Sequence, residues 1–285
     1  MNPASPSLTD AEVERGYNNR AAVPDHAAWL TRWAEASAAA LATGRVVRDL
    51  RYGSGPLETL DLFLPAGPAR GTLVFLHGGY WRALDKSDHA FVAPAFTARG
   101  IAVAVVNYDL CPRVTIATIV DECRRAVDWI VRDGRVHGAE PSRLVVAGHS
   151  AGGHLTAEMF RTDWRARGHL ANPVGGGVSI SGVHDLRPMT RFSFNTDFGL
   201  DDAEAARLSP VLGRPTTTAP LVIAVGGGET SEFLRQADLL WTVWPDNRPA
   251  GATGPLIVPG RHHFDVVMEL ADPASALARA SVALF

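Results

Sequence analysis

Short apolar runs alternate with amphipathic segments along most of the chain, and this alternation constrains the fold more than any other feature. The run Thr72–Leu76 has the length of a strand and is almost wholly apolar, which is typical of a strand covered on both faces. Segments with helical periodicity separate such runs, and residues 117–131 are a clear example. Strands joined through helices form right-handed crossovers, so the sequence predicts a largely parallel sheet with helices on both faces.

The elements that this pattern predicts divide as follows. The expected strands are residues 46–52, 59–64, 72–76, 101–106, 144–147, 178–180, 221–225 and 256–258. The expected helices are residues 25–42, 91–98, 117–131, 155–165, 232–243, 264–270 and 273–285. A short turn joins the first two strands, so we expect an antiparallel leading edge.

The chain is expected to form one domain over residues 17–285, preceded by a disordered or frayed segment, residues 1–16. Residues 182–218 are the least regular stretch and contain several prolines and aromatic residues. A long loop on an α/β scaffold is more often functional than structureless, so we expect this segment to be a partial lid over the site.

Composition excludes several classes of function. The net charge of the 285 residues is -3 and no cluster of basic residues is present, so a nucleic-acid partner is not expected. Two cysteines, Cys111 and Cys123, do not make a disulfide framework and are expected to be buried. With no apolar run that could span a bilayer and no apolar secretory signal, the chain is expected to be cytoplasmic, without a membrane partner. The sequence leaves open whether two copies of the chain form a homodimer.

The strongest functional signal is the sequence GHSAG at residues 148–152, which fits the pattern G-x-S-x-G. This pattern places a serine on a sharp turn between a strand and a helix, where small neighbours let the chain reverse direction. The predicted strand 144–147 precedes it and a helix follows, as the motif requires. Ser150 is therefore the predicted nucleophile, and the alternative is a plain glycine turn at the end of a strand.

A second signal, HGGYW at residues 77–81, follows the predicted strand 72–76. Acyl transfer develops negative charge on a carbonyl oxygen, and backbone N–H groups must already point toward it. We expect the N–H groups of Gly78, Gly79 and Ala151 to form this oxyanion hole, with His77 as a structural residue. A plain glycine turn is again the alternative.

A serine nucleophile needs a base, and the sequence GRHHFD at residues 260–265 follows the last predicted strand, where the base is expected. His263 is favoured over His262 because it lies next to Phe264 at the start of a predicted helix. A metal site is disfavoured, since no further ligand lies at a suitable spacing, and no cofactor is expected.

The base needs a carboxylate to orient it. Glu229 is the first carboxylate after the predicted strand 221–225 and is therefore the favoured acid. It has two rivals, Glu232 in the following helix and Asp185 after the strand 178–180. A helix-start carboxylate that offsets the helix dipole is the structural alternative for Glu229.

Several segments together resemble the arylformamidase (kynurenine formamidase) branch of the α/β-hydrolases. These segments are HGGYW at 77–81, NYDLCP at 107–112, GHSAGGHL at 148–155, SGVHDLRP at 181–188 and HHF at 262–264. The stretch YNNRAAVPDHAAWL at 17–30 resembles the N-terminal segment of the family's bacterial members, so the likeness covers nearly the whole chain. The GHSAG and HGG pieces occur in many esterases and specify only the superfamily.

The resemblance implies an α/β-hydrolase fold, with Ser150 as nucleophile, His263 as base and the acid at Glu229, where many members carry aspartate. A second departure is His184, where an aromatic residue such as tyrosine is common. An aryl formamide such as N-formylkynurenine, from tryptophan catabolism, is the implied small-molecule substrate. Tyr80 and Trp81 are expected to stack on its ring, unless they pack only against the lid. A carboxylesterase acting on small esters and a non-catalytic binding protein are the alternatives.

Overall fold

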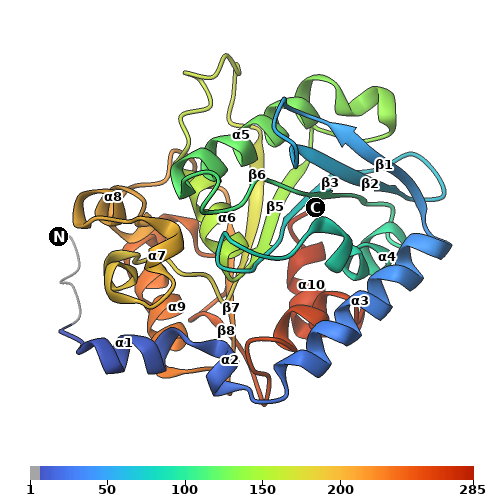
Figure 1. The fold of residues 1–285 in the computed structure, drawn as a ribbon. Helices are drawn as coiled ribbons and strands as arrows, with labels where there is room; N and C mark the ends of the chain where they lie inside the picture. Colours follow the sequence, from blue (N-terminus) through green and yellow to red (C-terminus); the bar gives the residue numbers. More distant parts are fainter. Residues whose placement is uncertain (1–6) are drawn as a thin grey trace.

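The computed structural model describes residues 7–285, in which one eight-stranded sheet forms the centre of the molecule (Figure 1). The strands are β1 (Arg45–Arg51), β2 (Thr59–Leu64), β3 (Thr72–Leu76), β4 (Ala102–Val106), β5 (Leu144–His149), β6 (Val174–Ile180), β7 (Leu221–Gly226) and β8 (Leu256–Val258). Their order is β1-β2-β4-β3-β5-β6-β7-β8. β1 pairs antiparallel with β2 and β2 with β4, whereas the other neighbours are parallel. The predicted mostly parallel sheet with an antiparallel leading edge is confirmed.

Helices cover both faces of this sheet. The α-helices are α1 (Asp10–Tyr17), α2 (Asn19–Ala22), α3 (His26–Thr43), α4 (Ala93–Thr97), α5 (Ile116–Arg132), α6 (Ala151–Arg161), α7 (Asn195–Phe198), α8 (Asp202–Arg207), α9 (Ser231–Val243) and α10 (Ala276–Val282). Short 3-10 helices are η1 (Lys86–Asp88), η2 (Ala90–Val92), η3 (Gly134–His137), η4 (Arg187–Arg191), η5 (Pro210–Leu212), η6 (Pro245–Asn247) and η7 (Val266–Leu270). In the described part of the chain, none of the helices is long and apolar enough to cross a membrane.

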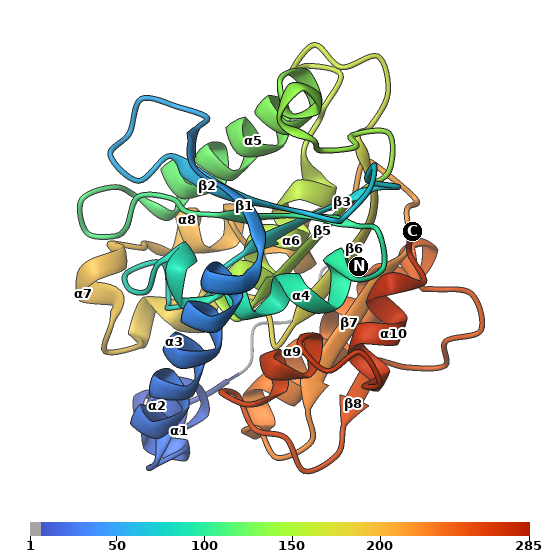
Figure 2. The same ribbon diagram turned by 90° about the vertical axis from the view of Figure 1, so that its right-hand side faces the viewer.

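The alternation of side chains along the strands divides the core into two layers. In β3, Val74 and Leu76 pack with α5, α6 and α9, whereas Leu73 and Phe75 face α3, α4 and α10. Figure 2 shows the sheet nearly edge-on, with these two groups of helices on its opposite sides. Because both faces are covered, the central strands are apolar without a polar alternate position. Cys111 and Cys123 are free and buried, as expected.

The N-terminal segment is more ordered than the sequence suggested. The expectation that residues 1–16 are disordered or frayed is wrong for its second half, which forms helix α1, and residues 1–6 lie outside the described part. Thr9 and Glu12 make a reciprocal capping box at the start of this helix. Val13 and Tyr17, one turn apart, are fully buried, so tertiary packing stabilises a helix too short to be stable alone.

Candidate active site

A sharp turn between β5 and α6 carries Ser150. Its backbone angles are φ 57° and ψ -117°, a conformation that a residue with a side chain adopts only when its surroundings enforce it. The Ser150 N–H donates to the carbonyl of Ile180 on β6 at 2.8 Å, which helps to hold the turn. The two glycines of the motif are required because a side chain at either position would collide with backbone. A Cβ on Gly148 would lie 2.1 Å from the Gly152 carbonyl oxygen, and one on Gly152 would lie 1.9 Å from the Leu76 carbonyl oxygen.

Helix α6 begins at Ala151, four residues earlier than the predicted segment 155–165, and ends at Arg161. The first N–H groups of a helix have no acceptor within it, and they carry the positive end of its dipole. The early start therefore places the Ala151 N–H and the helix N-terminus directly beside Ser150.

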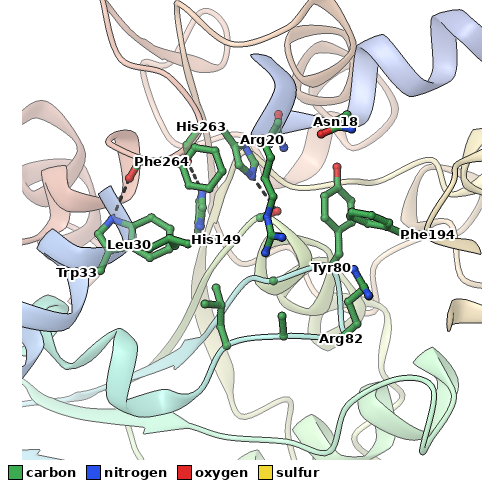
Figure 3. A pocket seen from close by; sticks show the side chains of 15 residues that line it. Asn18, Arg20, Leu30, Trp33, Tyr80, Arg82, His149, Phe194, His263 and Phe264 are labelled. Atoms are coloured by element: carbon green, nitrogen blue, oxygen red, sulfur yellow. Dashed lines mark hydrogen bonds between the residues drawn. The ribbon is translucent and has the colours of Figure 1, made fainter. Parts of the chain in front are cut away.

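His263 lies at the carboxyl end of the sheet in the loop after β8, and its imidazole contacts Ser150. The distance from His263 Nε2 to Ser150 Oγ is 3.0 Å (Figure 3). The ring of His263 also packs against the rings of Phe233 and His149, with centroids 4.5 and 4.8 Å apart. His149 Nε2 lies 2.9 Å from the backbone carbonyl oxygen of His263, which it can reach as a donor. The imidazole is therefore fixed on several sides, with one nitrogen facing the serine.

Glu229 binds the other nitrogen of this imidazole. Its Oε2 is 2.7 Å from His263 Nδ1, and its side chain is completely buried. Its Oε1 accepts the N–H of Gly226 at 2.8 Å and the hydroxyl of Ser181. Three groups, from the end of β7, the loop after β8 and the residue after β6, thus hold the carboxylate in one orientation.

The rival carboxylates are engaged elsewhere. Glu232 accepts the Tyr17 hydroxyl at 2.9 Å and pairs with Arg235. Asp185 is buried and pairs with Arg187 at 2.8 Å. Of the three carboxylates considered, Glu229 is the one bonded to His263.

The neighbouring histidine, His262, packs against other residues. Its ring lies edge-on to the ring of Trp29, with centroids 5.1 Å apart, and its Nδ1 accepts the N–H groups of Phe264 and Asp265. Within residues 7–285, no group of three or more His, Cys, Asp or Glu side chains is arranged to hold a metal ion.

The glycine loop after β3 lies against Ser150. A Cβ on Gly78 would come within 3.2 Å of the Ser150 Cβ, and Gly79 has φ +100°, a conformation that favours glycine. Beneath this loop, His77 is fully buried and its ring stacks on that of Tyr108 with centroids 4.1 Å apart. Burial lowers the pKa of His77, and its two ring nitrogens lie 2.8 Å from the Gly78 carbonyl oxygen and 3.1 Å from Asn107 Oδ1. Its place is structural.

A small pocket of about 60 Å³ opens above Ser150 and His263. Three parts of the chain complete its wall: the N-terminal segment through α2 and α3, the loop after β3, and the region that follows η4. Besides Ser150 and His263, the lining residues are Asn18, Asn19, Arg20, Leu30, Trp33, Gly79, Tyr80, Arg82, Ala83, Leu84, His149, Phe194 and Phe264 (Figure 3).

The two predicted substrate-binding residues differ in position. Tyr80 lines the pocket, and its ring packs against that of Phe194 at 5.7 Å between centroids. Trp81 does not line it: its side chain is fully buried between His154 and Phe198, with ring centroids 5.2 and 5.5 Å away. The expectation that Trp81 stacks on a substrate is therefore corrected, because the chain turns its ring into the core.

His184 likewise does not line the pocket. It is fully buried, and its Nε2 is 3.1 Å from the Ser179 hydroxyl. This departure from the family pattern therefore affects packing below the site and does not alter the pocket wall.

Sequence reasoning missed the contribution of the N-terminal segment. Asn18, Asn19 and Arg20 line the pocket although they precede Ser150 by some 130 positions along the chain. Trp33, which the sequence places only within the predicted helix 25–42, also lines it and donates its indole N–H to the Phe264 carbonyl at 2.9 Å. The likeness of residues 17–30 to a family segment was the one available signal.

The chain matches a family model described as the alpha/beta hydrolase fold over residues 73–211. It is 27% identical to the kynurenine formamidase of Salmo salar, over 85% of this chain and 83% of that protein. The kynurenine formamidase of Drosophila melanogaster is 28% identical, over 83% of this chain and 80% of that protein. A solved structure from Silicibacter sp. tm1040, provisionally named a thioesterase, superposes with a TM-score of 0.84 at 35% identity, covering 95% of this chain and 99% of that one. The similarity thus extends far beyond the residues around Ser150.

Proposed function

Because this chain belongs to the α/β-hydrolase family and to its arylformamidase-like branch, we propose that it hydrolyses an aryl formamide such as N-formylkynurenine through a covalent acyl-enzyme. The chain is a hydrolase. One observation carries the proposed mechanism: Ser150, His263 and Glu229 are joined in series, at 3.0 Å and 2.7 Å. This is the arrangement by which a serine hydroxyl becomes a nucleophile.

In the first half of the proposed reaction, Ser150 Oγ attacks the formyl carbon while His263 Nε2 takes the hydroxyl proton. The oxygen of the former carbonyl becomes negative, and the N–H groups of Gly78, Gly79 and Ala151 donate hydrogen bonds to it. Glu229 keeps the proton of His263 on Nδ1 and stabilises the imidazolium that forms.

The intermediate then collapses. The C–N bond breaks, and His263 gives its proton to the departing arylamine, which leaves Ser150 as a formyl ester. A water molecule attacks this ester as His263 takes one of its protons, and formate departs as the proton returns to Ser150 Oγ. The sum is aryl formamide plus water giving arylamine plus formate.

The pocket suits such a substrate. Aromatic and aliphatic side chains form much of its wall, namely Leu30, Trp33, Tyr80, Phe194 and Phe264. Faces and edges of this kind bind a planar ring, so the aryl leaving group can lie among them.

Turnover of matched substrates tests the proposal against a carboxylesterase that acts on small esters, because the same three residues can serve either reaction. N-formylkynurenine and a short-chain aryl ester should be compared at equal concentration. We expect the formamide to be cleaved with the higher kcat/KM. Cleavage of the ester without cleavage of the formamide would make the chain an esterase.

Covalent labelling tests the mechanism independently of the substrate. A fluorophosphonate should label the wild-type protein and fail to label Ser150→Ala. If neither protein is labelled, a non-catalytic binding protein becomes the better description, and equal labelling of both would move the nucleophile to another residue.

A further inference from the structure

Arg20 is a pocket residue with a charged side chain. It lies in α2, its side chain is exposed, and within residues 7–285 it has no hydrogen-bond or ion-pair partner. In Figure 3 its side chain extends from the N-terminal segment into the pocket, between His149 and Tyr80 in that view. A guanidinium presents up to five N–H donors in a rigid fork that matches a carboxylate.

The other charged groups near Arg20, at the open side of the pocket (its mouth), are already paired within the protein. Arg82 also lines the pocket, but it pairs with Asp197 and lies over the ring of Phe194, 4.5 Å from its centroid. Glu14, on the same segment as Arg20, accepts the amide of Asn18 at 2.8 Å and the N–H of Ser193. No aspartate or glutamate is among the residues that line the pocket. Within residues 7–285, the pocket wall therefore carries an unpaired positive charge and no carboxylate of its own.

Asn19 supplies a second, independent observation. Its side chain lines the same pocket and is 4% exposed, yet its Nδ2 has no partner in the described part of the chain. Leaving a buried polar group unsatisfied is costly, so native structures nearly always satisfy it with a ligand or water if not with protein. An amide nitrogen without a partner and a guanidinium thus belong to two adjacent residues of the pocket wall.

We infer that Arg20 and Asn19 form an anion-binding subsite. This subsite binds a carboxylate carried by the leaving group of the substrate. This inference rests on the proposed function and narrows it. The preferred substrates are aryl formamides whose arylamine portion bears a carboxylate, as N-formylkynurenine does, and neutral aryl formamides are poorer substrates. The anion is bound by groups outside the reacting centre, so it selects the substrate and does not take part in bond cleavage.

Two matched pairs of substrates test the subsite by turnover: an aryl formamide with a carboxylate and its carboxamide counterpart, and the corresponding pair of aryl acetates. The quantity to measure is the ratio of kcat/KM between the anionic and the neutral member. We expect the wild type to favour the anion, and Arg20→Gln to lower the ratio by about 10- to 100-fold, as for loss of a charge-assisted hydrogen bond. The ratio is unaffected by the folded fraction of each preparation.

Arg15→Gln is the matched control, because Arg15 is an exposed arginine on α1 that does not line the pocket. This control should keep the wild-type ratio. If the ratio falls equally in both variants, the preference is a general charge attraction and the subsite is overturned. If the ratio does not fall in Arg20→Gln, the subsite is overturned as well.

Binding separates failure of the subsite from failure of the proposed function. Calorimetry on Ser150→Ala, with kynurenine and kynurenine carboxamide as probes, does not depend on which acyl bond is cleaved. We expect kynurenine to bind at least tenfold more tightly than the carboxamide, and Arg20→Gln in the same background to abolish this difference. Equal binding of the two probes would overturn the subsite even if formamides are hydrolysed. Selective binding without formamide hydrolysis would overturn the proposed reaction alone.

Discussion

The floor and the mouth of the pocket are built differently. At the floor, the side chains of His263 and Glu229 are 6% and 0% exposed, and Ser150 is 3% exposed. Contacts from the carboxyl ends of the central strands hold all three residues. At the mouth, Arg20 and Phe194 come from segments outside the sheet and are partly or largely exposed. The floor is a rigid part of the scaffold, whereas the mouth is added to it. Substrate selection can therefore change without disturbing the reacting groups.

The largest expected effects lie at the floor. Ser150→Ala removes the nucleophile and His263→Ala removes the base, so we expect each to lower kcat by about four or more powers of ten. Because the three residues act as a unit, combining the two changes should add little further loss. Steady-state kinetics on folded variants checks this, and a near-normal rate in either single variant would show that the floor is not the reacting centre.

Glu229→Gln should have a smaller but still large effect. The amide keeps the shape of the side chain but cannot stabilise a charged His263, so we expect kcat to fall by about two to four powers of ten with little change in KM. Glu229→Asp should lose less, because the charge is retained although one methylene is lost. If Glu229→Gln were as active as the wild type, the carboxylate would be a structural group only.

This difference between floor and mouth also explains what the sequence could predict. The strands at 59–64, 72–76 and 256–258 have the bounds predicted for them, because short apolar runs between turn residues specify buried strands locally. Since functional residues in parallel sheets follow the carboxyl ends of strands, finding those ends placed Ser150 and His263 near each other before any contact was known.

Other features depend on packing that no local pattern shows. The start of α6 was predicted too late because Gly152 and Gly153 are poor helix formers. A Cβ on either would collide with backbone, at the Leu76 carbonyl oxygen or at the Cα of Gly182, so close packing selects glycine there in spite of its low helix propensity. The residues of the mouth were not predicted for a similar reason. Helical periodicity predicts that Trp33 is buried, but it does not predict which residues pack against it.

Ser181→Ala tests how firmly the floor holds its acid. The Ser181 hydroxyl donates to Glu229 Oε1, while the Gly226 N–H keeps donating to the same oxygen in the variant. Because one of two donors to that oxygen remains, we expect kcat to fall by about tenfold and KM to stay within twofold. A change in KM alone would assign Ser181 to substrate binding instead.

At the mouth the expected effect is smaller and has the opposite kinetic form. Phe194 lines the pocket and packs against Tyr80 and Phe192, with ring centroids 5.7 and 4.9 Å apart. Phe194→Ala removes aromatic surface that can contact the leaving group, so we expect KM to rise about three- to tenfold with kcat nearly unchanged. Measuring both parameters with N-formylkynurenine checks this. A fall in kcat without a rise in KM would place Phe194 with the floor.

The smallest effect concerns a buried contact between α6, which follows Ser150, and the segment 182–218, which contains Phe194. His154 on α6 is fully buried below Trp81, and its Nε2 lies 2.9 Å from the Leu208 carbonyl oxygen, just after α8 in the segment 182–218. Burial lowers its pKa to about 3, and the pKa values of His89 and His184 are lowered to about 3 for the same reason. These histidines are therefore neutral in the folded protein above about pH 3.

The unfolded chain takes up a proton at each such histidine below about pH 6.5, whereas the folded chain does not until about pH 3. Their contribution to stability is thus complete above pH 6.5 and is lost as the pH falls toward 3. Burial raises the pKa of Glu122 to about 7, so this residue increases stability as the pH falls from about 7 to 4.5. Comparing variants is therefore more informative than measuring the wild type alone.

Denaturant unfolding at several pH values should show a shallower loss of stability on acidification in His154→Gln, since glutamine can still donate to Leu208 and has no proton to gain. Identical pH dependence in the two proteins would mean that His154 is not a neutral buried link between floor and mouth.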